Sequence, residues 1–224
     1  DPRSTLAPVL RRYRETGRWA KLERILDELP AALTESLDGV IRISRIVLSM
    51  KEFSHPGTTV KTTTDINRAL ENTLTVSRNA WKHVAEVEQR FDPELPGVVC
   101  HAGEINQVFL NIILNAAQAI EMSDKPKPGH ITVTTRTDGE WVEIIFADDG
   151  PGVPEAIRER IFDMFFTTKQ IGKGTGQGLA ICRDVVVNKH GGRIDLTENP
   201  GGGAVFTIRV PVGGENGATD GEEE

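Results

Sequence analysis

The chain has 224 residues, 38% of them hydrophobic, enough for a core in one large domain or in a domain with an appendage. Five acids and no base fall in residues 213–224, so the formal charge of −7 leaves −7 + 5 = −2 for the rest. A nearly neutral body argues against a nucleic-acid-binding surface. The two cysteines lack metal-ligand spacing, and no apolar run has transmembrane length. We therefore expect reduced thiols, no membrane contact by this segment and a cytoplasmic location, with a membrane anchor elsewhere in a longer protein left open.

The first 56 residues are expected to be helical. Residues 1–29 mix bases with a sparse apolar pattern, which predicts two short amphipathic helices broken at Gly17. Residues 31–53 have no proline and a broad apolar face, so a helix of about 35 Å there must pack against at least one partner helix. It ends before Pro56, because the residue preceding a proline avoids helical geometry. We predict a helical region over 1–56, a second domain over 57–212 and an acidic disordered tail over 213–224.

The second domain alternates strands with helices. Asp65 is suited to cap a helix that runs to Lys82, and Asp138-Gly139 is a favoured two-residue hairpin turn. The other expected helices are 104–122, 154–162 and 179–190, and the expected strands are 59–64, 84–91, 97–100, 131–138, 141–147, 193–197 and 204–210. Helices that segregate from mostly antiparallel strands predict the α+β class, here a two-layer α/β sandwich preceded by an N-terminal helical segment.

Three amide side chains share one face of the expected helix over 104–122. Asn111, Asn115 and Gln118 are spaced by four and three residues, so they form a polar stripe on an otherwise apolar helix. Aligned amides beside a core are costly unless something polar lies opposite. An amide oxygen is a hard, neutral ligand suited to Mg²⁺, an ion that often shares nucleotide phosphates. Capping of nearby backbone would explain one of these amides but is a poor explanation for all three.

Asp148 ends an apolar strand and precedes Gly150-Pro151-Gly152. Alone, this run is typical of a turn. A carboxylate there could also accept a hydrogen bond from an exocyclic amine, while the glycines let the backbone approach a flat base. Its place after the amide stripe favours the second interpretation.

A glycine-rich stretch precedes the expected helix over 179–190. Gly172-Lys173-Gly174-Thr175-Gly176-Gln177-Gly178 offers unblocked N–H groups, and the helix beginning near Gly178 directs its N-terminus at whatever the stretch encloses. Such a helix end attracts phosphate, and Lys169 and Lys173 add positive charge. The alternative is a mobile solvent loop. The pattern is neither a Walker-type loop nor a Rossmann fingerprint.

Together with Phe165-Phe166-Thr167-Thr168-Lys169, these signatures resemble the ATPase superfamily shared by histidine kinases, type II topoisomerases, mismatch-repair ATPases and a heat-shock chaperone. That run and Thr175-Gly176-Gln177-Gly178-Leu179 resemble the sensor-histidine-kinase branch, and the resemblance covers roughly residues 31–212. It implies a Bergerat-type ATP-binding fold with ATP and Mg²⁺ as cofactors.

The resemblance also implies roles for individual residues. Asn115 would be the Mg²⁺ ligand, with Asn111 and Gln118 lining the phosphate side. Asp148 would read the adenine amine, with Gly150 and Gly152 flanking the base. Residues 162–177 would form a lid over ATP, and the contacts from this region would come from Phe166, Lys169, Lys173, Gly174, Thr175, Gly176, Gln177, Gly178 and Leu179. Gly201-Gly202-Gly203 would match the last glycine box, but Ala204 stands where the family commonly has threonine, so that hydroxyl is absent.

Such kinases autophosphorylate a histidine, usually within His-Glu/Asp-x-x-x-Pro, on the first helix of a dimerisation hairpin. None of the five histidines lies in that motif: they are His55, His83, His101, His130 and His190. His55 precedes Pro56, and the others stand at element boundaries, where surface or capping roles are expected. The helix over 31–53 resembles the second helix of the hairpin, so we expect the acceptor upstream of Asp1 and assign no catalytic residue to this chain.

The sequence thus predicts the ATP-binding catalytic core of a sensor histidine kinase, inactive by itself in autophosphorylation. It would transfer the γ-phosphoryl group to a histidine outside this chain, for onward transfer to a response-regulator aspartate. The implied partners are ATP, a second copy through the helical region in the full-length protein, and a receiver domain. Two alternatives stay open. One is an ATP-driven conformational clamp, for which Glu104 is the only acid near the start of the amide-bearing helix; the other is a non-catalytic module that binds nucleotide to regulate a partner.

Overall fold

The computed structural model describes residues 21, 24–25, 27–30, 32, 60–125, 128–169 and 174–213. The chain divides into two compact units, Asp1–Pro56 and Gly57–Glu224. The described residues of the first unit are helical, and Arg24 and Glu28 form an exposed ion pair one helical turn apart. The helix predicted over 31–53 lies almost wholly outside the described residues, and the acidic tail predicted over 213–224 does so beyond Gly213.

The second unit is built on a five-stranded sheet in the order β2-β4-β5-β7-β6. Its strands are β2 (Ala85–Arg90), β4 (Gly129–Asp138), β5 (Trp141–Asp148), β6 (Arg193–Glu198) and β7 (Ala204–Pro211). Only the pairing of β2 with β4 is parallel, and the other three pairings are antiparallel. β1 (Thr62–Thr64) and β3 (Val98–Cys100) form a separate antiparallel pair.

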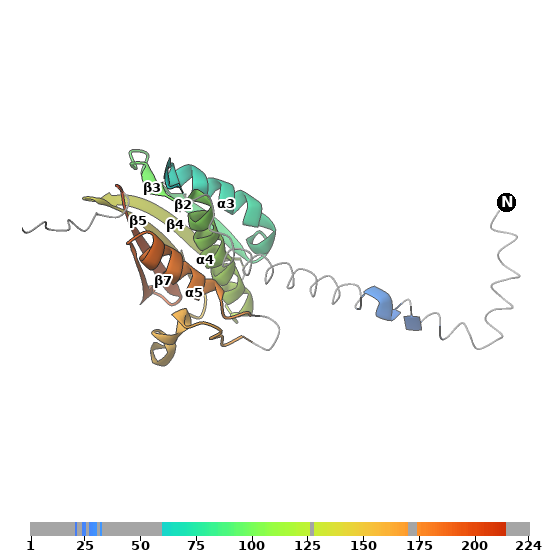
Figure 1. Cartoon of the computed structure of the whole chain (residues 1–224). Helices are drawn as coiled ribbons and strands as arrows, with labels where there is room; N and C mark the ends of the chain where they lie inside the picture. Colours follow the sequence, from blue (N-terminus) through green and yellow to red (C-terminus); the bar gives the residue numbers. More distant parts are fainter. Residues whose placement is uncertain are drawn as a thin grey trace, which may run out of the picture. The chain divides into compact units, whose positions relative to one another are not determined.

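Helices cover one face of this sheet, as Figure 1 shows. They are α3 (Ile66–Trp81), α4 (Ala102–Met122) and α5 (Gly178–Arg183), with α4 packed between the other two. One helical layer on one sheet is the predicted two-layer α/β sandwich, so the α+β prediction is confirmed.

The strand period of two decides which side chains enter the core. Val142, Ile144 and Phe146 of β5 are buried beneath the helices, and the Phe146 ring lies 5.9 Å from that of Phe109 on α4. Asp148 continues the same alternating row, so the register directs a carboxylate, and not an apolar side chain, toward the helical layer at the end of β5. This geometry sets the position of the candidate site.

Two predicted local features are confirmed, the second with a shift of one residue, and two need correction. The Asp65 carboxylate caps α3 by accepting a bond from Arg68 N, and a two-residue turn connects β4 to β5 with Gly139 at φ +62°. The turn is Gly139-Glu140, one residue later than the predicted Asp138-Gly139, because Asp138 still pairs with Trp141. The helix predicted over 154–162 is wrong: the segment forms two short 3₁₀ turns, η1 (Glu155–Ile157) and η2 (Arg160–Phe162). Only Ile161 is fully buried in those turns, which is too little apolar surface to hold an α-helix. The helix predicted over 179–190 is α-helical only in α5 and continues as a π-helix, η3 (Asp184–Lys189).

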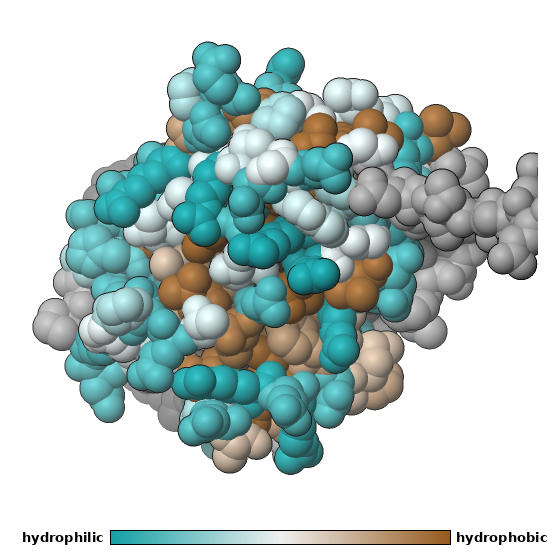
Figure 2. Space-filling view, turned by 90° about the vertical axis from the view of Figure 1, so that its left-hand side faces the viewer, coloured by the Kyte–Doolittle hydropathy of each residue, from teal (hydrophilic) through white to brown (hydrophobic). Residues whose placement is uncertain are grey.

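None of the helices in the described part of the chain has the length and apolar character needed to cross a bilayer. The face in Figure 2 is mostly hydrophilic at its rim, and hydrophobic residues reach the surface between polar ones toward its middle.

Candidate nucleotide-binding site

The amide stripe lies on the side of α4 that meets α5 and the segment after η2. Asn111 Nδ2 donates to the carbonyl of Gly178, 3.3 Å away, and so connects α4 to the first residue of α5. Further along α4, Lys169 Nζ donates to Asn115 Oδ1 at 3.1 Å and to Gln118 Oε1. The structure therefore brings the amide oxygens of Asn115 and Gln118 to one cation, here an ammonium group.

Lys169 is partly withdrawn from water in this position. Burial lowers the pKa of its ammonium, because the charged form loses solvation. No carboxylate bonds to Lys169 in the described residues, so neutral amide oxygens are what hold the charge. These oxygens form a pair arranged for a cation.

Asp148 is buried, with 4% of its surface exposed. Its Oδ1 accepts bonds from Gly150 N at 2.9 Å and from Ala204 N at 3.3 Å. None of the described residues donates to Oδ2, which leaves one carboxylate oxygen for a ligand. Burial raises the pKa of the Asp148 carboxyl, while these two N–H groups and the Lys125 ammonium act in the opposite direction.

Glycines allow two turns to meet around this carboxylate. A Cβ on Gly150 would lie 2.9 Å from Asp148 Oδ1. Gly152, at φ +75°, approaches the Gly203 carbonyl, and a Cβ on Gly203 would lie 1.9 Å from the Asp148 carbonyl oxygen. The turn after β5 and the β6–β7 turn thus touch through backbone. Of the last glycine box predicted from the sequence, residues 201–203, Gly203 lies beside Asp148, whereas nothing lies within 4 Å of a Cβ built on Gly201.

In the segment over residues 163–177, described except for 170–173, a backbone hydrogen bond joins a residue near the beginning to one near the end. Phe165 N donates to the Gly176 carbonyl at 2.9 Å, and both residues have positive φ, +67° and +65°. A Cβ on Gly176 would lie 2.4 Å from the Phe165 carbonyl carbon, so only glycine fits there. Phe166 is half-buried beneath the Arg160 guanidinium, 4.6 Å from its ring centroid.

The remaining predicted contacts differ in their surroundings. Gly174 approaches Thr167 and Lys169, Thr175 is exposed, and Gln177 N donates to the Thr175 hydroxyl at 3.4 Å. Leu179 packs against the hydrophobic core. Lys173 lies outside the described residues.

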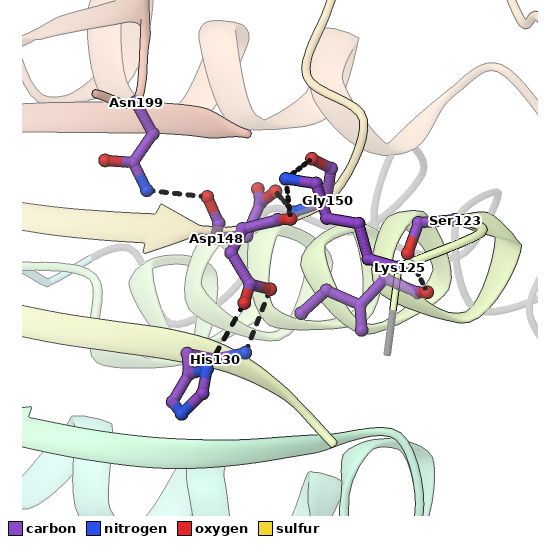
Figure 3. Close-up of polar contacts among 8 residues, drawn as sticks. Ser123, Lys125, His130, Asp148, Gly150 and Asn199 are labelled. Atoms are coloured by element: carbon purple, nitrogen blue, oxygen red, sulfur yellow. Dashed lines mark hydrogen bonds and ion pairs between the residues drawn. The ribbon is translucent and has the colours of Figure 1, made fainter. Parts of the chain in front are cut away.

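Sequence reasoning missed three side chains that hold the turn after β5, drawn in Figure 3. Lys125 Nζ donates to the carbonyls of Asp149 and Gly150, at 2.7 and 3.2 Å. Asn199 Nδ2 donates to the Asp148 carbonyl at 2.8 Å, and His130 bonds to the Asp149 carboxylate through N and Nδ1. Lys125 lies between α4 and β4, Asn199 lies between β6 and β7, and His130 lies in β4. Because they are far apart in the sequence, no local spacing indicates them.

Glu104 does not lie near the amide pair. It precedes Asn115 by eleven residues on α4, about 16 Å along the helix axis. Its Oε1 is bonded to Lys189 Nζ at 2.7 Å, at the far end of η3. It is therefore not placed to activate a water molecule at Asn115, and this counts against the conformational-clamp alternative.

Residues 101–214, just over half of the chain, match the family described as "Histidine kinase-, DNA gyrase B-, and HSP90-like ATPase". The chain belongs to this family, and the predicted ATP-binding domain of the histidine-kinase type is confirmed.

Among similar proteins, the sensor histidine kinase ZraS of Klebsiella oxytoca is 34% identical over 176 residues, which cover 78% of this chain and 36% of ZraS. Full-length ShkA in complex with AMPPNP superposes with a TM-score of 0.64 at 26% identity, over 83% of this chain and 38% of that chain. Histidine kinase ThkA in complex with the response regulator protein TrrA superposes with a TM-score of 0.62 at 26% identity, over 93% of this chain and 61% of that chain. The chain spans just over a third of the length of ZraS and similar curated relatives.

Proposed function

We propose that this chain is the catalytic core of a sensor histidine kinase, which binds Mg²⁺ and ATP and transfers the γ-phosphoryl group to a histidine on a dimerisation helix. One observation carries the proposal: a buried carboxylate with a free oxygen and a pair of amide oxygens facing a cation occur in the segment that matches the ATPase family. The carboxylate is suited to bind a nucleobase, and the amide pair is suited to bind a metal ion that also contacts phosphate.

Asp148 is the proposed adenine-reading residue. Its Oδ1 is fixed by two backbone N–H groups, so Oδ2 keeps one orientation. In that orientation Oδ2 would accept a hydrogen bond from the exocyclic amine of adenine. Gly150 and Gly152 lie next to it without side chains, which leaves room for a flat ring on the backbone.

Asn115 is the proposed Mg²⁺ ligand. Its Oδ1 already accepts from a cationic group beside Gln118 Oε1, which is the donor set a hard cation prefers. The described residues hold no cluster of three or more His, Cys, Asp or Glu, so nucleotide phosphates and water would supply the other ligands. When bound, Mg²⁺ would neutralise phosphate charge.

The phosphate side is assigned to the residues around the amide stripe. Asn111, tied to Gly178, would line it, and Lys169 would exchange its amide contacts for phosphate oxygens. The other proposed contacts are Phe166, Lys173, Gly174, Thr175, Gly176, Gln177 and Leu179. No side chain needs to form a covalent intermediate, since phosphoryl transfer rests on positioning and charge stabilisation.

The proposed partners follow from the relatives. ThkA has been solved in complex with a response regulator, which supports a receiver domain as the partner that takes the phosphoryl group onward. Dimerisation through the first 56 residues and a cytoplasmic location are proposed on the same resemblance.

The test is calorimetric titration of the chain with ATP and Mg²⁺. Asp148→Ala and Asn115→Ala should each weaken binding about ten- to a hundredfold, because the first removes a hydrogen bond to an ionised acceptor and the second removes a metal ligand. Asn188→Ala, which removes only an exposed bond to Asp184, is the control and should bind as the unmodified chain does. Unchanged binding in both site variants would reject the proposed site.

A second measurement separates the three functional classes. The chain is mixed with a separate protein carrying an acceptor helix and with ATP labelled at the γ-phosphate. A kinase labels the added protein on histidine, a clamp releases labelled phosphate, and a regulatory module does neither. Release of phosphate without labelling would contradict the kinase assignment.

A further inference from the structure

Lys125 lies in the connection between α4 and β4, outside every motif that indicated the site. Its ammonium reaches the turn after β5 and donates to two successive carbonyl oxygens, Asp149 O at 2.7 Å and Gly150 O at 3.2 Å (Figure 3). These carbonyls belong to the two residues that directly follow Asp148. Lys125 therefore binds the backbone that sets the direction of the Asp148 side chain.

Other contacts hold different atoms of the same turn. Asn199 holds the Asp148 carbonyl, the His130 carbonyl accepts from Asp149 N at 3.2 Å, and Asp148 Oδ1 itself accepts from Gly150 N. These bonds fix where the turn begins. The two carbonyls bonded to Lys125 fix how the peptide planes after Asp148 are rotated, and that rotation decides where Gly150 N points.

Lys125 also contacts the second turn that supports Asp148. A Cβ built on Gly202 would lie 3.0 Å from Lys125 Nζ, so the lysine lies against the β6–β7 turn. Two residues further on, Ala204 N is the other donor to Asp148 Oδ1. One ammonium group thus lies between the two backbone segments that hold the carboxylate.

We propose that Lys125 is a positioning residue for base recognition: it holds the turn after β5 so that Asp148 Oδ2 is presented to the exocyclic amine of adenine. This inference rests on the proposed nucleotide site and adds to it a residue that determines specificity for the base. Lys125 does not itself touch the base. It acts through the orientation of Asp148, and so it should affect adenine more than other bases.

The experiment compares ATP and GTP binding by calorimetry, with Mg²⁺, in the unmodified chain, Lys125→Met and Lys125→Arg. Methionine keeps the length and apolar stem but donates no bond, so ATP affinity should fall about tenfold or more, the loss expected for bonds from a charged donor. GTP affinity should change less, because a guanine presents a carbonyl and not an amine to Asp148. Arginine restores charge and donors and should recover most of the ATP-to-GTP ratio.

Lys82→Met is the matched control, because Lys82 is an exposed lysine at the end of α3. It should leave both affinities unchanged. An equal loss of ATP and GTP affinity in Lys125→Met, without rescue by arginine, would show a merely structural role and overturn the inference. Unchanged ATP binding in Lys125→Met would also overturn it, while failure of the unmodified chain to bind ATP would instead refute the proposed function.

Discussion

Among the described glycines, Gly203 is the one at which an added Cβ would meet the closest neighbouring atom. It has φ +118°, and a Cβ there would lie 1.9 Å from the Asp148 carbonyl oxygen. A side chain would have to separate the β6–β7 turn from the end of β5. The same movement would withdraw Ala204 N from the Asp148 carboxylate.

Gly203→Ala should therefore destabilise the domain by more than about 2 kcal/mol, since backbone strain and a steric clash add, and should weaken ATP binding. Gly201→Ala is the matched control: Gly201 also has positive φ, +93°, but nothing lies within 4 Å of its built Cβ. That variant should show the smaller cost of the positive φ alone. Urea unfolding measures both, and equal losses would mean that the close approach to Asp148 is relieved at no cost.

His190 connects the end of η3 to the start of α4 in its neutral form. Its Nδ1 donates to the Val185 carbonyl at 2.7 Å, and its Nε2 accepts from His101 N at 2.9 Å. Burial lowers the pKa of His190, with smaller contributions from Lys61 and His101 in the same direction, whereas the bond to Val185 and Glu104 oppose them. A proton on Nε2 would break the bond from His101.

The pH dependence of stability follows from this lowered pKa. Above the ordinary histidine pKa near 6.5, native and unfolded states are both neutral at this ring, and the contribution of His190 is complete. As pH falls through about 6.5, the unfolded chain takes up a proton that the native state does not, so the free energy of unfolding decreases until the native group also titrates.

Urea unfolding between pH 7.5 and 5.5 should show this decrease. His190→Asn should be less stable at pH 7.5 by about 1–3 kcal/mol, because a buried bond is lost, and its stability should depend less on pH. His83→Asn, at an exposed position, should keep the pH dependence of the unmodified chain. A pH dependence unchanged in His190→Asn would show that other groups cause it.

How much of the site the sequence indicates depends on whether its residues are close along the chain. Asn111, Asn115 and Gln118 were predictable because a helix converts spacing into a shared face, and the structure brings two of them to one cation. Asp148 was indicated by its place at the end of an apolar strand. Lys125 was not, because it meets its carbonyls only through the return of the chain from α4 into β4, beside β5.

At the scale of elements, the same distinction separates strands from irregular helices. The alternation of buried side chains and the turn at Gly139 made the β4–β5 hairpin predictable. The π-helix η3 was not predictable from the sequence. Its C-terminal end is held by bonds to residues far away in the chain, from Lys189 to Glu104 and between His190 and His101. The helix propensity of the local sequence carries no information about such distant partners.

Residues 163–169 and 174–177, the described parts of the predicted lid, are held in place by few contacts. These contacts include the Phe165–Gly176 backbone bond, the Phe166 ring, which lies beneath Arg160 and packs against the core, and the bonds from Lys169 to the amide pair. A segment with so few anchors opens locally at low cost. Bound ATP would contact this segment and should therefore suppress its local opening.

Hydrogen exchange in residues 162–169 and 174–177 should therefore be fast without nucleotide and slow with ATP and Mg²⁺. Lys169→Met should accelerate exchange further in the nucleotide-free chain, because it removes the bonds to Asn115 and Gln118. Lys189→Met, which removes an ion pair at Glu104, is the control and should leave exchange in this segment unchanged. Exchange that is slow and equal with and without ATP would contradict a lid role.

At the scale of the whole molecule, none of the histidines in the described part of the chain is placed to receive the γ-phosphoryl group from the proposed ATP site. Among the described histidines, His190 is buried and bonded, and the His101 ring lies edge-on against it at 5.4 Å. His130 is bonded to Asp149 on the proposed base side of the site, and His83 is exposed beyond the end of α3. His55, outside the described residues, precedes Pro56 and lacks the acid-flanked acceptor motif.

We therefore expect this chain to bind ATP without phosphorylating itself. Phosphoryl transfer requires an imidazole held close to the γ-phosphate and in line with it, and proximity of that kind accounts for a large part of the rate. Incubation with γ-labelled ATP, followed by separate acid and alkali treatments, measures the outcome. No label should remain on this chain, whereas an added acceptor-helix protein should carry label that survives alkali and is lost in acid. Alkali-stable, acid-labile label on this chain itself, abolished by His55→Gln, would mean that the acceptor lies at the end of the helical region and that its sequence context was misread.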